Sequence, residues 1–365
     1  MPRRVLALSL LVLFCPAALS FSVPQKRVES AKSDFVPANN PSIQYIGRID
    51  FTNPKRPRFW ASGVCIMARF KGSYCDILVN DEQLYGNNHN YIEIVIDDGK
   101  PFRVQTTGVA NSIRAAAGLV GGEHTILICK DTESGNGYLE FLGFKCAGLL
   151  PLPVQTGPIR RLEFVGDSIT CGMSADLSIP CGKGQWFDQH NAYLAYGPVT
   201  ARSLGTEWSL TSVSGIGLIH SCCGMTITMP EVFDKLNPRA NAFPWDFSRY
   251  QPDAVTICLG QNDGVQDSAK FCDAYVRFIE QVRAHYPQAE IVCLTSPMAD
   301  AALTAFLKAS LTSVVERMNK SGDAKVHSFF FSKRYHNGCW DHPDVAEHQQ
   351  IANELEPYLK QLLGW

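Results

Sequence analysis

The pattern of apolar residues changes its period near residue 150, and this change constrains the fold more than any other feature of the chain. Upstream of it, isoleucines at every second position of residues 92–96 precede the dipeptide Asp98-Gly99. Alternation followed by a turn dipeptide is typical of a half-buried strand in a β-hairpin. Further short strands are expected at 63–70, 74–79, 124–129 and 138–144. Strands of this length and spacing predict an antiparallel β-sandwich over residues 43–150.

Downstream, short apolar runs alternate with longer segments of helical period. The runs expected to be buried strands are 162–165, 208–213, 254–259 and 291–294. Residues 271–282 and 303–314 carry apolar side chains at the spacing of one helix face. Strands that alternate with helices predict an α/β fold, a parallel sheet flanked by helices, over residues 158–365. The proline-containing stretch 149–158 is the expected boundary between the two domains.

The first 20 residues have the features of a secretory signal peptide. Arg3 and Arg4 precede the apolar run 5–14, and the small residues Ala18 and Ser20 stand where a signal peptidase would cleave. The run is too short for a mature membrane anchor, which needs about 20 apolar residues. The sequence therefore predicts a secreted or periplasmic protein.

An alternative is a lipoprotein signal that uses Cys15, but Phe14 and Pro16 flank this cysteine where small residues would be expected. Residues 21–42, in which prolines lie among polar residues, are expected to form a leader or linker. No later stretch has the length of a membrane span.

Charge and motif content exclude several functional classes. The formal net charge is −2 and no basic run occurs, so neither nucleic acid nor an anionic membrane surface is an expected partner. No CxxC pair, HExxH motif or other metal-ligand spacing is present, and neither a metal nor another cofactor is expected.

The chain contains 13 cysteines, and export would permit disulfides among them. Cys129, Cys258 and Cys293 lie inside apolar runs and are expected to be buried thiols. Cys171 and Cys181, in a loop-like segment, form the first pair to test for a disulfide.

Three motifs directly follow predicted strands. Ser168 lies in GDSIT, Gly215 in SGIG and Asn262 in GQND. A serine at a strand end can present its hydroxyl at the rim of a sheet, and an asparagine can aim its amide there. A glycine lets backbone N–H groups approach a bound oxygen without a Cβ in the way. Each motif alone is equally a common turn, so the case depends on their occurring together.

A histidine precedes the last predicted helix. His342 lies in Asp341-His342-Pro343, ahead of a segment with apolar residues at 345, 351, 355 and 359. A constrained loop of this kind suits a positioned base. His348, which falls on the helix itself, is expected to face solvent.

The order Ser168, Gly215, Asn262, His342 resembles that of the SGNH hydrolases, a superfamily named for these four residue types. The resemblance covers residues 158–365 and implies the flavodoxin-like sheet of that superfamily. It also implies a serine esterase in which Ser168 is the nucleophile and His342 the general base. The Ser168 N–H, the Gly215 N–H and the Asn262 amide would then bind the oxyanion.

The first half of the chain extends the resemblance. The motifs YIGR at 45–48, FWASG at 59–63, RFKG at 69–72 and KDTES at 130–134 are similar to those of carbohydrate esterase family two. Members of that family pair a jelly-roll sandwich with an SGNH domain. They deacetylate plant polysaccharides, so the resemblance implies an acetylxylan esterase-like enzyme that acts on a xylan or glucomannan.

One position departs from the superfamily pattern. Most SGNH hydrolases have an aspartate three residues before the histidine, and Cys339 stands there in this chain. Family two often works with a Ser–His dyad in which a backbone carbonyl orients the imidazole. That arrangement is favoured here, and Asp341 is the alternative.

Trp340 and Trp186 lie near these motifs and are candidates for stacking on a sugar ring, although core packing explains each equally well. Two other functions stay open at this point. One is an SGNH-type lipase or thioesterase of broader acyl specificity, and the other is a glycan-binding protein with a vestigial esterase domain.

Overall fold

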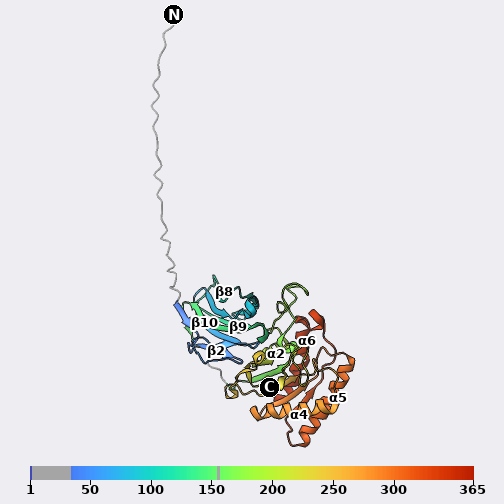
Figure 1. Ribbon diagram of the computed structural model, residues 1–365. Coiled ribbons are helices and arrows are strands. Elements are labelled where there is room, and N and C mark those ends of the chain that lie inside the picture. Colours follow the sequence, from blue (N-terminus) through green and yellow to red (C-terminus); the bar gives the residue numbers. More distant parts are fainter. Residues whose placement is uncertain (2–33, 154–156) are drawn as a thin grey trace. The chain divides into compact units, whose positions relative to one another are not determined.

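The computed structural model describes Met1, residues 34–153 and residues 157–365 (Figure 1). The predicted signal peptide and the predicted leader up to residue 33 lie outside the described residues. Within the described part, no helix is both long enough and apolar enough to span a bilayer.

Two antiparallel sheets pack on one another in the first half of the chain. The first has the order β1 (Asp34–Pro37), β10 (Leu139–Cys146), β5 (Cys75–Asp81), β8 (Ala110–Ala116), with β3 (Arg58–Phe59) also on β10. The second has the order β11 (Leu149–Leu150), β4 (Cys65–Lys71), β9 (Glu123–Lys130), β6 (Tyr91–Ile96), β7 (Phe102–Gln105), with β2 (Ile43–Ile46) also on β4. One buried cluster draws on both sheets, for example Ile77 and Phe141 from the first and Ile94 and Ile128 from the second. The predicted β-sandwich is therefore confirmed.

The sandwich begins earlier than the sequence indicated. Residues 34–37, inside the predicted leader, form β1 and pair with Gly143–Cys146 of β10. Val36 is buried in the sandwich core. The strand DFVP is too short to show an alternating pattern, and its partner lies at the far end of the domain, so no local signal marks it.

Strand β6 is buried on both faces, which its alternating isoleucines did not indicate. Ile92 and Ile94 face the sandwich core, whereas Val95 packs into the cluster that contains the parallel sheet. Glu93 is 3% exposed, and its carboxylate accepts a hydrogen bond from Asn191 at 3.2 Å. At β6, the second sheet of the sandwich therefore packs against the C-terminal region instead of facing solvent.

Five parallel strands form the sheet of the second half. Their order is β13 (Glu207–Ser212), β12 (Arg161–Gly166), β16 (Ala254–Cys258), β17 (Glu290–Leu294), β18 (Val326–Phe329). The first strand in sequence, β12, is thus second in the sheet. The next strand, β13, lies at the near edge, and the last three strands follow on the other side of β12. This strand order is that of flavodoxin-like folds. The predicted α/β architecture is confirmed.

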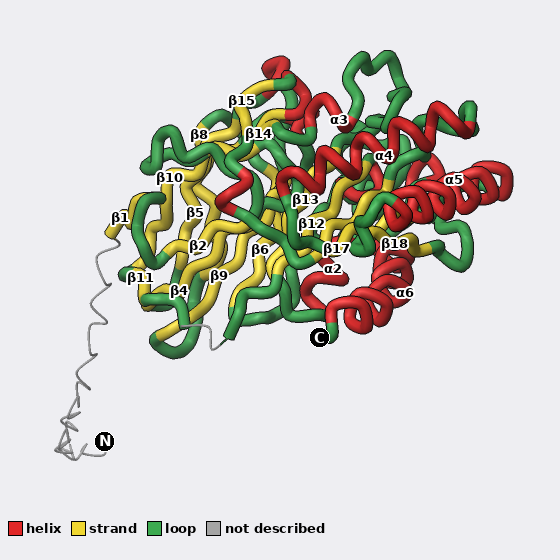
Figure 2. Tube along the Cα trace, turned by 90° about the horizontal axis from the view of Figure 1, so that it is seen from below, coloured by secondary structure: helices red, strands yellow, loops and turns green. Residues whose placement is uncertain are grey.

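Helices cover both faces of the parallel sheet (Figure 2). α4 (Ser268–His285) and α5 (Ala301–Lys320) share a buried cluster with Val255 and Ile257 of β16. α2 (Tyr196–Ser203) and α6 (Val345–Leu363) share another with Ala254 and Cys258 of the same strand. Because neither face meets solvent, the strands are continuous apolar runs. The remaining elements are short: α1 (Ser168–Cys171), α3 (Met229–Val232), and the pair β14 (Lys235–Asn237) and β15 (Ala242–Pro244).

The strand order brings three predicted site residues to one edge. β13, β12 and β16 are adjacent and parallel, so their carboxyl ends lie together. Gly215, Ser168 and Asn262 follow these three strands. Since the chain continues from β12 first to one neighbouring strand and later to the other, this edge is the topological switch point, where open α/β sheets bind their ligands.

A buried ion pair joins the two halves. Arg48, in the loop after β2, places Nη2 2.8 Å from Oε1 of Glu163 in β12, and the side chains are 2% and 0% exposed. Thr211 and Tyr286 also donate hydrogen bonds to this carboxylate. A buried charge that loses its partner is strongly destabilising, so the pair ties the sandwich to β12, the strand that precedes Ser168.

Arg48→Met is expected to lower the free energy of unfolding by about 3–5 kcal/mol, because Glu163 would stay buried without its cation. Urea denaturation measures the loss. Arg69→Met is the matched control: Arg69 pairs with Glu123 at 2.8 Å, but both side chains are partly exposed to solvent. Its loss should be at most about 1 kcal/mol. Equal losses in the two variants would contradict the role of the buried pair.

Candidate active site

The turn between β12 and α1 presents Ser168 at the sheet edge. A Cβ on Gly166 would lie 2.1 Å from Oγ1 of Thr170, so glycine is required where the strand ends. Asp167 caps α1 by accepting the Ile169 N–H at 3.0 Å. Ser168 is thus the first residue of the helix and is 5% exposed. Its N–H is one of those that a helix start leaves unpaired.

The imidazole of His342 lies between the hydroxyl of Ser168 and a backbone carbonyl. Nε2 is 2.8 Å from Oγ of Ser168, and Nδ1 is 3.0 Å from the carbonyl oxygen of Trp340. Since a carbonyl only accepts, Nδ1 carries the proton, and Nε2 is left to accept from the hydroxyl. Burial lowers the pKa of His342, although the carbonyl of Trp340 opposes that shift. The ring is therefore neutral at pH 7, and its unprotonated Nε2 can act as a general base.

The Asp341 side chain points away from the imidazole. Its carboxylate lies 3.5 Å from the guanidinium of Arg334 and is 70% exposed. Trp340 and Asp341 both have left-handed backbone conformations, with φ of 51° and 59°. Two such residues in succession reverse the chain, so that the Trp340 carbonyl faces the ring of His342.

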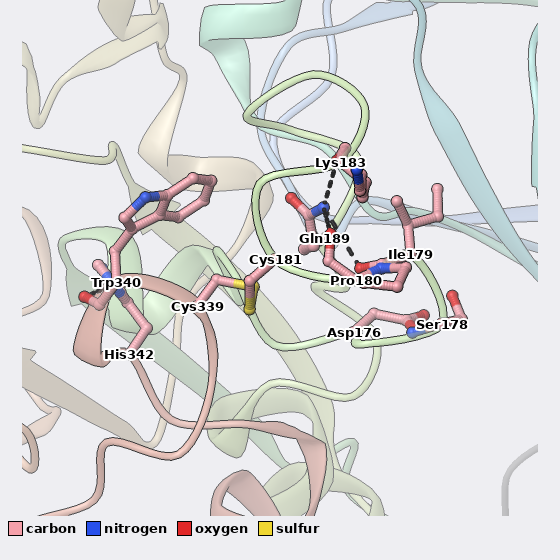
Figure 3. Close-up of a disulfide and its surroundings, with 10 residues drawn as sticks. All are labelled: Asp176, Ser178, Ile179, Pro180, Cys181, Lys183, Gln189, Cys339, Trp340 and His342. Atoms are coloured by element: carbon pink, nitrogen blue, oxygen red, sulfur yellow. Dashed lines mark hydrogen bonds between the residues drawn. A yellow bond between two sulfur atoms is a disulfide. The ribbon is translucent and has the colours of Figure 1, made fainter.

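A disulfide fixes the loop that carries His342. Cys339 is bonded to Cys181, which lies in the loop after α1, 158 residues earlier in the chain (Figure 3). The Cys181 loop is itself held by Gln189, whose side-chain amide donates to the carbonyl of Lys183 at 2.9 Å. The residue that replaces the usual aspartate is thus used as a covalent anchor.

The predicted Cys171–Cys181 pair is wrong. Cys171 ends α1 as a fully buried free thiol, whose sulfur lies 3.3 Å from Oγ of Ser212. Its position in the helix turns it toward the sheet and away from the loop. Cys129, Cys258 and Cys293 are buried free thiols, as predicted.

Gly215 and Asn262 lie beside Ser168. The Ile216 N–H donates to the Val213 carbonyl at 3.2 Å, which closes a turn in which Gly215 has φ +84°. A side chain is strained in that conformation. The Nδ2 of Asn262 donates to the Ile216 carbonyl at 2.9 Å and lies 3.3 Å from Oδ2 of Asp167. The amide is therefore held in one orientation.

One cavity of about 440 Å³ joins all the predicted site residues. Ser168, His342, Gly215 and Asn262 line it, together with Trp340 and Trp186. The two tryptophans are 54% and 39% exposed. Large apolar side chains that stay exposed at a cavity are typical of ligand-binding surfaces.

Sequence reasoning missed two carboxylates that hold the loop around Gly215. Asp263, in the GQND motif, accepts the N–H groups of Leu218, Ile219 and His220 at 2.7–3.1 Å. Glu133, in the KDTES motif of the first half, accepts the Ser214 N–H at 2.7 Å. Both acids stand inside motifs that the sequence had singled out, but nothing local indicates which backbone they bind.

His348 was expected to face solvent and is instead fully buried. Its Nδ1 accepts the Tyr196 N–H at 3.2 Å, at the contact between α6 and α2. Burial lowers its pKa to about 3, so the ring is neutral. The prediction for His348 was wrong because α2 was not predicted. Without α2, the face of α6 that carries His348 had no expected partner.

Among residues 34–153 and 157–365, no group of three or more His, Cys, Asp or Glu side chains is arranged to hold a metal ion.

The flavodoxin-like strand order and the four residues at its switch point define the class of protein as an SGNH-type hydrolase. Family models agree with this class in both halves. Residues 45–153 match the model described as carbohydrate esterase 2 N-terminal. Residues 164–344 match the GDSL-like lipase/acylhydrolase family.

Curated proteins and solved structures narrow the class. The cellulase/esterase CelE of Acetivibrio thermocellus is 32% identical over 340 residues, which are 90% of this chain and 40% of that relative's length. An acetylxylan esterase / glucomannan deacetylase of Cellvibrio japonicus is 29% identical over 342 residues, 90% of this chain and 91% of the relative. A family two carbohydrate esterase from Clostridium thermocellum, solved in complex with cellohexaose, matches with a TM-score of 0.79. That match is 32% identical and covers 88% of this chain and 99% of the solved one. The chain belongs to carbohydrate esterase family two.

Asp341→Asn is expected to keep kcat on 4-nitrophenyl acetate close to that of the unmodified protein, because the Asp341 carboxylate faces Arg334 and solvent. Steady-state kinetics of the two proteins measure it. Replacing a triad aspartate costs about 10⁴-fold in kcat, and a loss of that size would show that Asp341 orients His342 after all.

Proposed function

We propose that this protein is a secreted esterase that removes O-acetyl groups from a plant-type polysaccharide through an acetyl-Ser168 intermediate. The observation that carries the proposal is the 2.8 Å between Nε2 of His342 and Oγ of Ser168. These two side chains line the same cavity as Gly215 and Asn262. A nucleophile, its base and candidate oxyanion donors are the parts that acyl transfer requires.

In the first step, Oγ of Ser168 attacks the acetyl carbonyl while Nε2 of His342 takes its proton. The hydrogen bond from Nδ1 to the Trp340 carbonyl stabilises the imidazolium that forms. The Ser168 N–H, the Gly215 N–H and the Asn262 amide bind the developing oxyanion. His342 then protonates the sugar oxygen, which leaves, and Ser168 carries the acetyl group.

In the second step, His342 removes a proton from water, which attacks the acetyl ester of Ser168. Collapse of this second tetrahedral intermediate returns the proton from Nε2 to Oγ and releases acetate. The same ring therefore acts as base, acid, base and acid in turn. A pKa that burial holds below 6.5 keeps the ring in its basic form at neutral pH.

Relatives and aromatic side chains support a carbohydrate substrate. One relative is named acetylxylan esterase / glucomannan deacetylase, and one solved neighbour holds cellohexaose. Trp340 and Trp186 stand exposed at the cavity and offer flat apolar faces on which a sugar ring can stack. Their roles as substrate contacts, and the catalytic roles above, are part of the proposal.

Secretion rests on the first 20 residues, whose paired arginines, apolar run and small residues have the form of a signal peptide. We assign residues 43–150 with β1 to the sandwich domain and residues 158–365 to the catalytic domain. A polymeric substrate cannot enter a cell intact, which agrees with an exported enzyme.

Acetate release tests the function directly. The protein is expected to release acetate from acetylated xylan or acetylated glucomannan and from 4-nitrophenyl acetate, and Ser168→Ala, the blank, should release none by the acyl-enzyme route. Rates on 4-nitrophenyl esters should fall as the acyl chain is lengthened from acetate to butyrate and octanoate. Rates that rise with chain length would indicate a lipase, and equal rates with Ser168→Ala would rule the mechanism out.

The acid limb of kcat/KM should lie below pH 6.5. Only neutral His342 can accept the serine proton, and burial lowers its pKa, so activity persists at neutral pH and is lost as the pH falls through the lowered value. Asp167 could also titrate nearby, since burial raises its pKa to about 7. Asp167→Asn, which keeps a cap on α1, is the control and should show the same limb. A limb centred above pH 6.5, or one that Asp167→Asn removes, would assign the limb to another group.

A further inference from the structure

We infer that Glu133 is a positioning residue for the oxyanion site, through which the sandwich domain takes part in catalysis. The inference rests on the proposed function and concerns how the Gly215 N–H is aimed. Glu133 follows β9 and belongs to the sandwich, whereas Gly215 follows β13 of the catalytic sheet. The carboxylate of Glu133 crosses from one domain to the backbone of the other.

The contact is direct and buried. Oε2 of Glu133 accepts the Ser214 N–H at 2.7 Å, and the Glu133 side chain is 1% exposed. Ser214 is the first central residue of the turn that places Gly215. Holding the peptide before Ser214 restricts the orientation of the next peptide, which carries the Gly215 N–H.

The turn at Gly215 needs a contact from another residue to hold it, because glycine has no side chain that could pack. Gly215 has φ +84°, a conformation it adopts without a side chain to pack against its surroundings. Asp263 holds the far end of the same loop through the N–H groups of residues 218–220. Residues 214–220 are therefore held at both ends by carboxylates, one from each domain.

His190 explains why the anchor is a carboxylate. Its Nε2 is 3.1 Å from Oε1 of Glu133, and both side chains are at most 1% exposed. One oxygen of Glu133 thus binds His190, while the other binds Ser214 and lies 3.6 Å from the sulfur of Cys171. Burial raises the pKa of Glu133, but hydrogen bonds from His190 and from the Ser214 N–H outweigh it and hold that pKa below its usual value. Two acceptors are needed, and an ionised carboxylate provides both.

Of the His190 ring and the Ser214 N–H, an amide at this position can accept from only one with its single oxygen. If the amide oxygen of the Glu133→Gln variant accepted from Ser214, the NH₂ group of the new side chain would face Nε2 of His190. The ring would then have to move its proton to Nδ1, which has no hydrogen-bond partner among the described residues. Glu133→Gln should therefore have an intermediate effect, and Glu133→Ala the full one.

The test compares Glu133→Ala and Glu133→Gln with a matched control, Asp81→Asn. Asp81 also lies in the sandwich, is 2% exposed, and accepts the Asn90 N–H at 2.9 Å. On 4-nitrophenyl acetate, Glu133→Ala is expected to lower kcat by about 10²-fold, the effect of a misplacement near 1 Å, with little change in KM. Glu133→Gln should fall between it and the unmodified protein, and Asp81→Asn should keep kcat.

A double variant separates positioning from general damage. Asn262→Ala alone should cost about 10²–10³ in kcat. If Glu133 acts on the same oxyanion, adding Glu133→Ala to Asn262→Ala should cost much less than the product of the two separate losses. Multiplicative losses, or a Glu133→Ala variant with a lower melting temperature and an unchanged kcat, would overturn the inference. Should Glu133→Ala fail to fold, the same cycle is run with Glu133→Gln.

Hydrogen exchange makes the result independent of the proposed function. The Ser214 amide should be protected in the unmodified protein and should exchange faster in Glu133→Ala, while the Leu218 amide, held by Asp263, stays protected. Unchanged Ser214 exchange contradicts the anchor whatever the activity. If the unmodified protein hydrolyses no acetyl ester but Ser214 exchanges faster in Glu133→Ala, the proposed function is refuted, whereas the hydrogen bond from Ser214 to Glu133 is still supported.

Discussion

The candidate active site depends on three parallel strands that end at the same edge of one sheet. β12 lies between β13 and β16, so the residues that follow them are neighbours although the sequence separates them. This order brings Ser168, Gly215 and Asn262 to one edge, and hydrogen bonds to Asp167, Asp263 and Glu133 hold the loops that carry them. His342 is the exception, since it comes from a loop before α6 and must be brought to the serine by other means.

A disulfide and a backbone carbonyl bring His342 to Ser168 and orient its ring. The Cys181–Cys339 disulfide holds the His342 loop against the loop after α1, and the left-handed backbone at Trp340 and Asp341 turns the Trp340 carbonyl toward Nδ1. A carbonyl carries no full charge, so it orients the imidazole with little cost of burial, whereas a buried carboxylate would need compensating partners. Replacement of the aspartate by Cys339 is therefore consistent with the remaining geometry.

Local patterns predicted much of the fold and the four residues at the sheet edge, because strands and strand-end motifs have signatures within a few residues. The parts that escaped depend on distant partners. α2 contains Gly197 and Pro198, which weaken a helical pattern, yet a Cβ on Gly197 would lie 2.8 Å from Phe164, so this glycine is what lets the helix approach the sheet. The same holds for the Cys181–Cys339 pair and for the backbone that Glu133 binds. Each of these features depends on contacts between segments that are far apart in the sequence, so no local spacing predicts them.

The second sheet of the sandwich packs part of its outer face against the parallel sheet, and this contact limits how such a protein can evolve. Ile46, Cys65 and Val95 share one cluster with Leu162 and Leu210 of the parallel sheet. Gly63 meets Leu210 so closely that a Cβ there would lie 2.7 Å from it. Interfaces between separable domains of one chain are usually more polar than obligate interfaces. These two share a core, so recombination would have to transfer them as a single unit.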